Sequence, residues 1–309
     1  METQIQNILS QTTTKTRKIQ QLIFLGLTRK KIAELVTDGN YGFVQNVYAK
    51  MRLEGRLNAV TQAININIFD RKFGVEFEAY NVTKTVLKNA LNAAGIRCEI
   101  EGYNHTTKRH WKIVSDASLS GNDTFELVSP ILIGESGINE LKTVCRVLNE
   151  CGAKVNKSCG THVHFDAAGF NLDIWKRIYV NYFRLENTID GFMPRSRREN
   201  TYCKGLRNIT NFESKINGCL NLNEIASVFG SSRYFKINPV SYSRHNTCEF
   251  RQHSGTVEFE KIENWIKFLN NLVEYSKSNL VTDKTLNGLQ NFNDNEIVDY
   301  LKTRTLKLA

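Results

Sequence analysis

The sequence of 309 residues contains no apolar run of about 18 residues, the length that a membrane-spanning helix requires. Its N-terminus also lacks the apolar stretch and small-residue cleavage site of a secretory signal peptide. We therefore expect a cytoplasmic protein without a membrane partner. Proline is scarce, with three residues, and the hydrophobic content of 41% is that of a folded globular chain rather than a disordered one.

The sequence also lacks any zinc-knuckle pattern, because none of its seven cysteines has the spacing Cys-x-x-Cys. Their odd number and scattered positions make reduced thiols the default expectation. Cys159 lies near His162 and His164, which allows a cysteine nucleophile with a histidine base. A buried, inert thiol is the better interpretation, because the sequence offers no third residue to orient the base.

Charge is unevenly distributed along the chain. The formal net charge is +10, and residues 1–60 contribute +5 of it, from nine Lys and Arg against four Asp and Glu. Such an excess suggests a polyanionic partner, either nucleic acid or the phosphates of a nucleotide. It says nothing about the fold.

The basic segment 1–60 is predicted to be a small all-α head of three helices. Apolar residues repeat at helical spacing, Thr28 is placed as an N-cap, and residues 38–40 break the second helix from the third. Residues 26–48 resemble a helix-turn-helix, whose last helix lies in the major groove of DNA. By that resemblance the candidate DNA-binding residues are Arg29, Lys30, Tyr41, Gln45, Asn46 and Lys50. The alternative is a head that docks a protein or a substrate.

Beyond a linker at residues 61–71, we expect a larger α+β domain over residues 72–280 and a tail, 281–309, with a short helix. Strand and helix patterns alternate along this domain, but the Val- and Ile-rich runs of a buried parallel sheet are missing. An antiparallel sheet backed by helices, with its other face open as a site, is the predicted architecture.

Acidic residues within apolar strand segments are the strongest chemical signal. Glu76 and Glu78 alternate with Val75 and Phe77, so both carboxylates project from one face of a strand. Taken alone, a strand glutamate more often pairs with a cross-strand cation. Several carboxylates on one face repel one another unless a cation lies between them, and with a histidine they suit magnesium or manganese. The predicted metal ligands are Glu76, Glu78, Glu126, His162 and Glu249.

Six ordered segments resemble the amidoligase family. They are residues 111–119, 125–130, 158–165, 196–203, 233–238 and 248–256, which include Thr-His-Val-His at 161–164 and Cys-Glu-Phe-Arg at 248–251. The match runs in order over roughly two-thirds of the chain, which makes it far more specific than any single motif.

This resemblance implies a relative of glutamine synthetase and glutamate-cysteine ligase that uses ATP and Mg²⁺ or Mn²⁺ to join a carboxylate to an amine through an acyl phosphate. The substrates would be peptides, proteins or small molecules. It implies catalytic roles for Arg251 and Glu249. The residues assigned to ATP or substrate binding are Arg195, Arg197, Arg198, Asn200, Arg233, Asn238 and His164. Only one of His162 and His164 is expected to touch metal, and the other to shape the site.

Two other functions remain open from the sequence. One is a metal-dependent hydrolase in which Cys159, His162 and His164 hold zinc, although it leaves Glu76 and Arg251 without a role. The other is a DNA-binding regulator whose ligase-like domain only senses a ligand.

Overall fold

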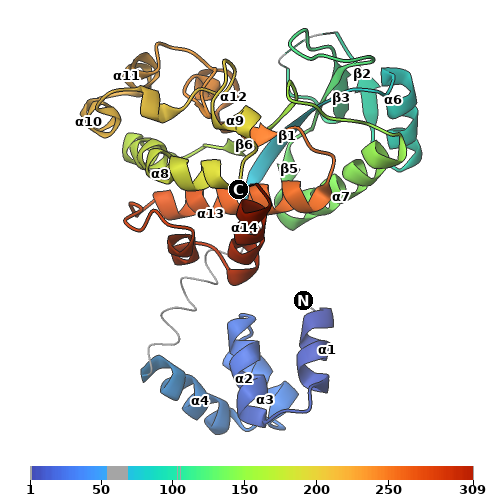
Figure 1. Ribbon diagram of the computed structural model, residues 1–309. Helices are drawn as coiled ribbons and strands as arrows, with labels where there is room; N and C mark the ends of the chain where they lie inside the picture. Colours follow the sequence, from blue (N-terminus) through green and yellow to red (C-terminus); the bar gives the residue numbers. More distant parts are fainter. Residues whose placement is uncertain (1, 54–68, 103, 105, 309) are drawn as a thin grey trace. The chain divides into compact units, whose positions relative to one another are not determined.

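The computed structural model describes residues 2–53, 69–102, 104 and 106–308 (Figure 1). The chain divides into two compact units, Met1–Ile68 and Phe69–Ala309. The predicted end of the head at residue 60 and most of the predicted linker, residues 61–68, lie outside the described residues. Within the described ranges, no helix has both the length and the apolar character to cross a membrane.

The described part of the head is all α-helical and has its own apolar core. Its helices are α1 (Glu2–Ser10), α2 (Lys15–Phe24), α3 (Arg29–Val36) and α4 (Tyr41–Leu53). The core is built mainly from Ile19, Leu22, Ile32, Val44 and Met51.

The prediction of three helices was wrong, because α1 adds a fourth. Its Ile5, Ile8 and Leu9 fall at helical spacing and pack against the core of the head.

The predicted helix boundaries inside the head are present. The hydroxyl of Thr28 accepts a hydrogen bond from the backbone N–H of Lys31, which makes Thr28 the N-cap of α3. Asp38 and Gly39 have positive φ angles of 52° and 86°, and they separate α3 from α4. Asn40 then accepts a hydrogen bond from the N–H of Phe43 in the first turn of α4.

The second unit is built on one mixed sheet, and the predicted α+β class is confirmed. Its strands are β1 (Lys72–Ala79), β2 (Cys98–Ile100), β3 (Trp111–Val114), β4 (Phe125–Val128), β5 (Leu132–Ile133), β6 (Gly160–Asp166), β7 (Ile237–Asn238) and β8 (Thr247–Ser254). The strand order is β2-β3-β4-β1-β6-β8-β7, with β5 paired to the start of β1. Every pair is antiparallel except β2 with β3.

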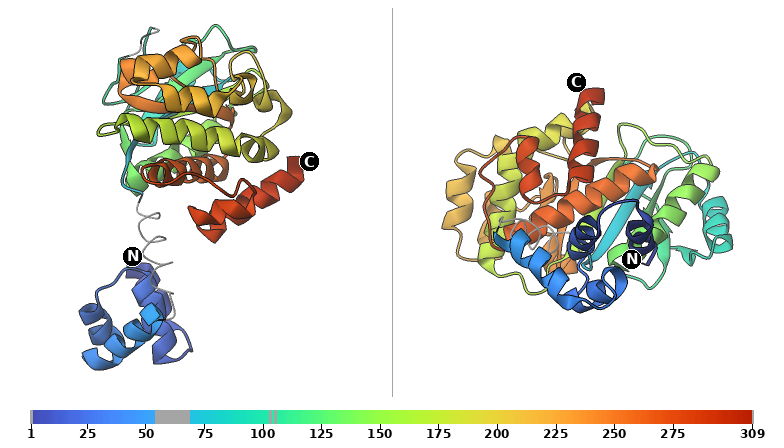
Figure 2. Two further views of the ribbon diagram at one scale, coloured as in Figure 1. Left: turned by 90° about the vertical axis from the view of Figure 1, so that its left-hand side faces the viewer. Right: turned by 90° about the horizontal axis from the view of Figure 1, so that it is seen from below.

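Helices flank this sheet. They are α6 (Lys84–Ala93), α7 (Gly134–Glu150), α8 (Leu172–Gly191), α9 (Arg195–Arg198), α10 (Phe212–Gly218), α11 (Leu222–Val228), α12 (Ser241–His245), α13 (Phe259–Ser276) and α14 (Asn295–Leu308). Figures 1 and 2 show α7, α8 and α13 running along one side of the sheet. Their apolar stripes, such as Trp175, Tyr182 and Leu185 on α8, are buried there.

The register of the central strands gives the sheet two chemically different faces. Phe77 pairs with Leu127 across β1 and β4, and both side chains are buried in the core. On the opposite face, Glu78 pairs with Glu126, and Glu76 pairs with His162. The strands therefore bring acids and histidines from distant parts of the chain onto one surface.

Several elements differ from the sequence-based expectation. Helix α7 begins at Gly134 rather than at residue 139, and the predicted strand 234–237 is reduced to the short β7. Gly134 has φ +49°, and a Cβ there would lie 2.3 Å from the carbonyl oxygen of Phe69. The start of α7 thus depends on a tertiary contact that helical periodicity does not reveal.

Candidate active site

A cavity of about 350 Å³ opens on the acidic face of the central strands. Side chains from β1, β3, β4, β6, β7 and β8 line it, together with residues of α9 and α12. The predicted site residues that line it are Glu76, Glu78, Glu126, His162, His164, Arg197, Arg233, Asn238, Glu249 and Arg251. The sheet therefore gathers all the predicted metal ligands into one place.

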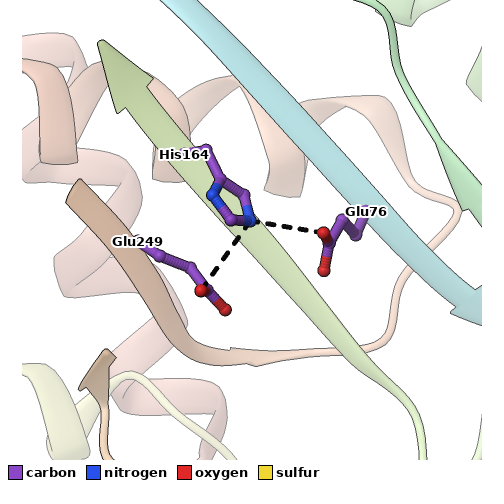
Figure 3. Close-up of side chains that lie close together, drawn as sticks. All are labelled: Glu76, His164 and Glu249. Atoms are coloured by element: carbon purple, nitrogen blue, oxygen red, sulfur yellow. Dashed lines mark ion pairs between the residues drawn. The ribbon is translucent and has the colours of Figure 1, made fainter. Parts of the chain in front are cut away.

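One group of candidate ligands consists of Glu76, His164 and Glu249 (Figure 3). The Nε2 atom of His164 lies 3.3 Å from Oε1 of Glu76 and 4.0 Å from Oε2 of Glu249. This nitrogen is buried and has no hydrogen-bond partner among the described residues. An imidazole nitrogen that faces two carboxylates without a hydrogen bond fits a metal ligand.

The other nitrogen of this imidazole is held in place. Nδ1 of His164 lies 3.0 Å from the hydroxyl oxygen of Thr247, which lies 2.9 Å from the hydroxyl of Ser241. If Nδ1–H donates to Thr247, Nε2 presents its lone pair to the cavity. A ligand imidazole oriented in this way is typical of metal centres.

Two further groups extend from the first, each sharing one residue with the group before it. Glu76, Glu126 and His162 form one, and Glu78, Asp116 and Glu126 form the other. In each group the ligand atoms lie within 4.8 Å of one another. Nδ1 of His162 is 2.9 Å from Oε2 of Glu76. The sharing of Glu76 and Glu126 gives a continuous line of carboxylates across the cavity floor.

The carboxylates divide into two electrostatic classes. Burial alone raises the pKa of Glu76, but His164 and His162 outweigh it and hold that pKa well below its usual range. Burial also opposes ionisation of Glu249, yet His164 and Arg251 lower its pKa to about 2. The pKa of Glu126 is instead raised well above its usual range, by burial and then by the charges of Glu76 and Glu78. The excess negative charge beside Glu126 is what a divalent cation would offset.

Arginines face the acids from the same surface. Arg251 on β8 donates from Nη1 to Oε1 of Glu249 at 2.6 Å, while its buried Nε has no partner among the described residues. The charges of Glu249 and Glu76 overcome burial and raise the pKa of Arg251. Arg197 is buried and donates to the backbone carbonyls of Arg251 and Gln252. The cavity therefore places fixed positive charge beside its line of carboxylates.

Sequence comparison identifies the family of the protein that carries this site. The profile of the family described as "Putative amidoligase enzyme" matches residues 70–273, which contain every residue of the carboxylate line. The chain belongs to the amidoligase family. Membership assigns it a ligase-type enzymatic function.

Other comparisons add little to the family assignment. A solved structure described as "Crystal structure of novel glutamine synthase homolog" has 11% sequence identity, covers 79% of this chain and 67% of that chain, and has a TM-score of 0.38. No curated protein matches the sequence.

Some residues assigned to ATP or substrate binding in this amidoligase-family protein do not line the cavity. These are Arg195, Arg198 and Asn200. Arg198 donates to the backbone carbonyls of Met193 at 2.9 Å and Leu308 at 3.2 Å, and Asn200 donates to that of Ser196. By contrast, Asn238 donates to Oε2 of Glu249 at 2.6 Å. Arg197 therefore lines the cavity, whereas Arg198 connects the backbone at Met193 to the backbone at Leu308.

The lining residues that had no role in the sequence-based assignment include Asp116 and Lys112. Asp116 follows β3 and joins Glu78 and Glu126 in one of the ligand groups. Lys112 is buried on β3 and donates to the carbonyls of Asn104 and Thr106, and burial lowers its pKa. An acid two residues beyond the end of a strand was a usable signal for Asp116, whereas the sequence around Lys112 is that of an ordinary strand lysine.

Cys159 does not have the surroundings of a nucleophile or a zinc ligand. Its side chain is buried, and burial raises the pKa of the thiol. Among the described residues, the groups of side chains that could hold a metal contain His162 and His164 but not Cys159. The zinc-hydrolase alternative therefore has no support in this geometry.

In the head, two of the candidate DNA-binding residues contact one another. Arg29 donates to the side-chain oxygen of Gln45 at 2.7 Å and lies over the ring of Tyr48. The other candidates, Lys30, Tyr41, Asn46 and Lys50, are exposed. DNA binding through them stays a prediction.

Proposed function

We propose that this protein is an ATP- and divalent-metal-dependent ligase that joins a carboxylate to an amine through an acyl phosphate. The observation that carries the proposal is the line of carboxylates and imidazoles with Arg251 on the same sheet face. Family membership supports the ligase class. The donor set supports a hard cation, because it is rich in carboxylate oxygen and has no thiolate.

In this proposal the ligands of magnesium or manganese are Glu76, Glu78, Asp116, Glu126, His162, His164 and Glu249. The bound ions would neutralise the triphosphate and align it for transfer. Arg251, whose Nε has no hydrogen-bond partner among the described residues, would stabilise the negative charge that develops on the transferred phosphoryl group. Arg197 adds a second fixed cation at the cavity wall.

The reaction has two balanced steps. An oxygen of the substrate carboxylate forms a bond to the terminal phosphorus of ATP, and ADP leaves with the electron pair of the broken bond. The amine nitrogen then bonds to the carbonyl carbon, phosphate departs, and the amine proton passes to that phosphate. Arg251 acts in the first step, where charge builds up on the transferred group.

Metal-dependent ATP binding and the variant Glu126→Gln test the proposal. The negative charges of Glu76 and Glu78 repel the carboxylate of Glu126. A neutral glutamine at this position should therefore leave the metal-free protein at least as stable as wild type. The same change removes a metal ligand and should weaken binding of ATP with magnesium by about tenfold or more. Calorimetric titration of ATP and thermal unfolding measure the two effects.

Glu150→Gln on the exposed end of α7 is the matched control and should change neither quantity. Equally tight ATP binding in the presence of a chelator, or unchanged binding by Glu126→Gln, would refute the metal assignment.

A further inference from the structure

A second cavity, of about 460 Å³, lies beside β3 and the segment after α6. Figure 1 shows β3 and α6 at the margin of the sheet that ends in β2. Its charged lining residues are three cations, Arg97, Lys108 and Arg109, and one acid, Glu140. The segment Pro130–Ile131 lines both this cavity and the central one. The two cavities therefore share one wall, and a ligand in one can extend toward the other.

The acidic side chains around the second cavity already have partners. Glu140 accepts a hydrogen bond from Nε1 of Trp111 at 2.6 Å, and Glu101 lies 2.8 Å from Nε2 of His110. Glu99, on β2, pairs with Lys88 at 2.7 Å. Lys108 also lies 3.9 Å from Glu101, and Glu140 keeps its own negative charge, so the remaining positive charge of the cavity lies on Arg97 and Arg109.

Arg97 and Arg109 are the two side chains that carry this charge. Both are exposed, and neither guanidinium has a hydrogen bond or an ion pair within the ranges that the structure describes. A guanidinium presents a planar fork of donors that matches a carboxylate. The shared wall adds an apolar contact, because Ile131 is 59% exposed between the two cavities.

We propose that this second cavity, in the β2–β3 corner, binds a carboxylate of the substrate that is remote from the reacting group. The substrate of the ligase is then an acidic peptide, whose reacting end lies in the central cavity while its chain crosses Ile131. Arg97 and Arg109 select for it, because a neutral or basic peptide leaves both guanidinium groups without a partner. This assignment rests on the proposed ligase function.

Binding of short peptides to the full-length protein tests the assignment without requiring turnover. Triglutamate, trialanine and trilysine, each with the same uncharged fluorescent label, are titrated with protein and followed by fluorescence anisotropy. Wild type should bind triglutamate about tenfold more tightly than trialanine, the difference expected from one to two charge-assisted contacts at an exposed site. The double variant Arg97→Gln/Arg109→Gln should lose that preference.

A charge-matched control separates this cavity from the general basicity of the protein. Arg146→Gln/Lys154→Gln removes the same two charges from exposed positions outside both cavities and should keep the preference for triglutamate. Loss of the preference in this control, or its survival in Arg97→Gln/Arg109→Gln, overturns the assignment. So does wild-type protein that binds triglutamate no better than trialanine.

Calorimetric titration of ATP with magnesium, run on the same samples, separates the two proposals. If ATP binding fails but the peptide preference depends on Arg97 and Arg109, the ligase proposal falls and the carboxylate-binding cavity stands. If ATP binds normally to wild type and to the double variant while no peptide preference is found, the ligase proposal stands and the acidic-peptide assignment falls.

Discussion

Arg251 shows how single residues in this protein depend on position more than on type. Its Nη1 is engaged by Glu249 at 2.6 Å, yet its Nε is buried without a partner among the described residues. Arg197 and Arg198 are adjacent in sequence, but Arg197 lines the cavity and Arg198 binds the backbone at Met193 and Leu308. The same side chain is therefore placed for chemistry at one position and for structure at the next.

Replacement of Arg251 should separate catalysis from binding. Arg251→Ala should lower ADP release by about a hundredfold or more, because the arginine acts on charge that develops in the transition state. Affinity for ATP should change little, and Arg251→Lys should restore activity only in part, since a point charge cannot replace a planar fork. The measurement is ADP release with pooled cell extract as the source of substrates, with mass spectrometry for amide products lighter by one water.

Exposed Arg146 is the control, since Arg146→Ala should leave the rate unchanged. An Arg251→Ala variant that releases ADP as fast as wild type would rule out the role given to Arg251.

At the scale of elements, a buried ionic cluster joins α8 to the strands behind the site. Lys236 is fully buried, and its Nζ lies 2.8 Å from Oε1 of Glu186 and 2.7 Å from Oδ1 of Asp190, both on α8. Asp190 also accepts a hydrogen bond from the side chain of Gln252 on β8. The backbone carbonyl of Gln252 in turn accepts a hydrogen bond from Arg197. The cluster thus links the packing of α8 to the position of a cavity arginine.

Removing the cation from this cluster should cost much of the stability of the second unit. Lys236→Met removes the buried cation and leaves Glu186 and Asp190 with the partly exposed Arg207 alone. Breaking a buried ion pair in this way typically costs about 3–5 kcal/mol. Urea unfolding followed by circular dichroism measures the loss. Lys302→Met, at an exposed pair with Asp299, should stay within about 0.5 kcal/mol of wild type. A Lys236→Met variant as stable as wild type would show that the cluster makes no net contribution to the free energy of unfolding.

The contact between β8 and α13 should make stability depend on pH. His253 is buried against Trp265, and burial, assisted by the charge of Arg304, lowers its pKa to about 3. In the unfolded chain the pKa of histidine is about 6.5. The folded state therefore binds fewer protons, so this stabilisation is complete above pH 6.5 and is lost as the pH falls from 6.5 toward 3.

Between pH 7 and pH 5 the free energy of unfolding should fall by about 2 kcal/mol on account of His253. The variant His253→Gln has no group that titrates in this range, so its pH dependence should be flatter by that amount. Urea unfolding of both proteins at the two pH values checks this. An equal change in the free energy of unfolding between the two pH values in both proteins would show that His253 is not the titrating group.

At the scale of the whole molecule, the chain combines an all-α head with an amidoligase-family unit. The head has its own apolar core, and exposed Lys30 and Lys50 lie on α3 and α4. Nothing in the chemistry of the carboxylate line requires such a head. From the helix pattern of this basic head we predict duplex DNA as its partner.

Full-length protein should bind duplex DNA with an affinity that decreases steeply between 50 and 200 mM salt, because lysine contacts with phosphates release counterions. Lys30→Gln/Lys50→Gln should weaken binding. It should also reduce the slope of log affinity against log salt concentration by the amount expected for the loss of about two phosphate contacts. Electrophoretic mobility shifts at several salt concentrations measure both, with Arg146→Gln/Lys154→Gln as the charge-matched control. Absence of a shift at low salt would make the head a docking unit for a protein or a substrate.

Local pattern was enough to determine much of this protein. Alternation with period two places Glu76 and Glu78 on one face of β1, and Thr28 and Thr83 cap the helices that the apolar spacing predicts. Ordered motifs were sufficient to recognise the family, and the family profile confirms it. These features depend on residues a few positions apart, so they can be read along the chain.

Other features were decided only by the tertiary structure. The pairing of β1 with β4 and β6 brings Glu126 and His162 to Glu76, and the pairing of β3 with β4 brings Asp116 to Glu126. Helical spacing alone did not separate Arg197 from Arg198 or reveal that α7 starts at Gly134. Strand register and loop paths follow from contacts between segments far apart in the chain, and the energies of those contacts are not encoded in any short stretch of sequence.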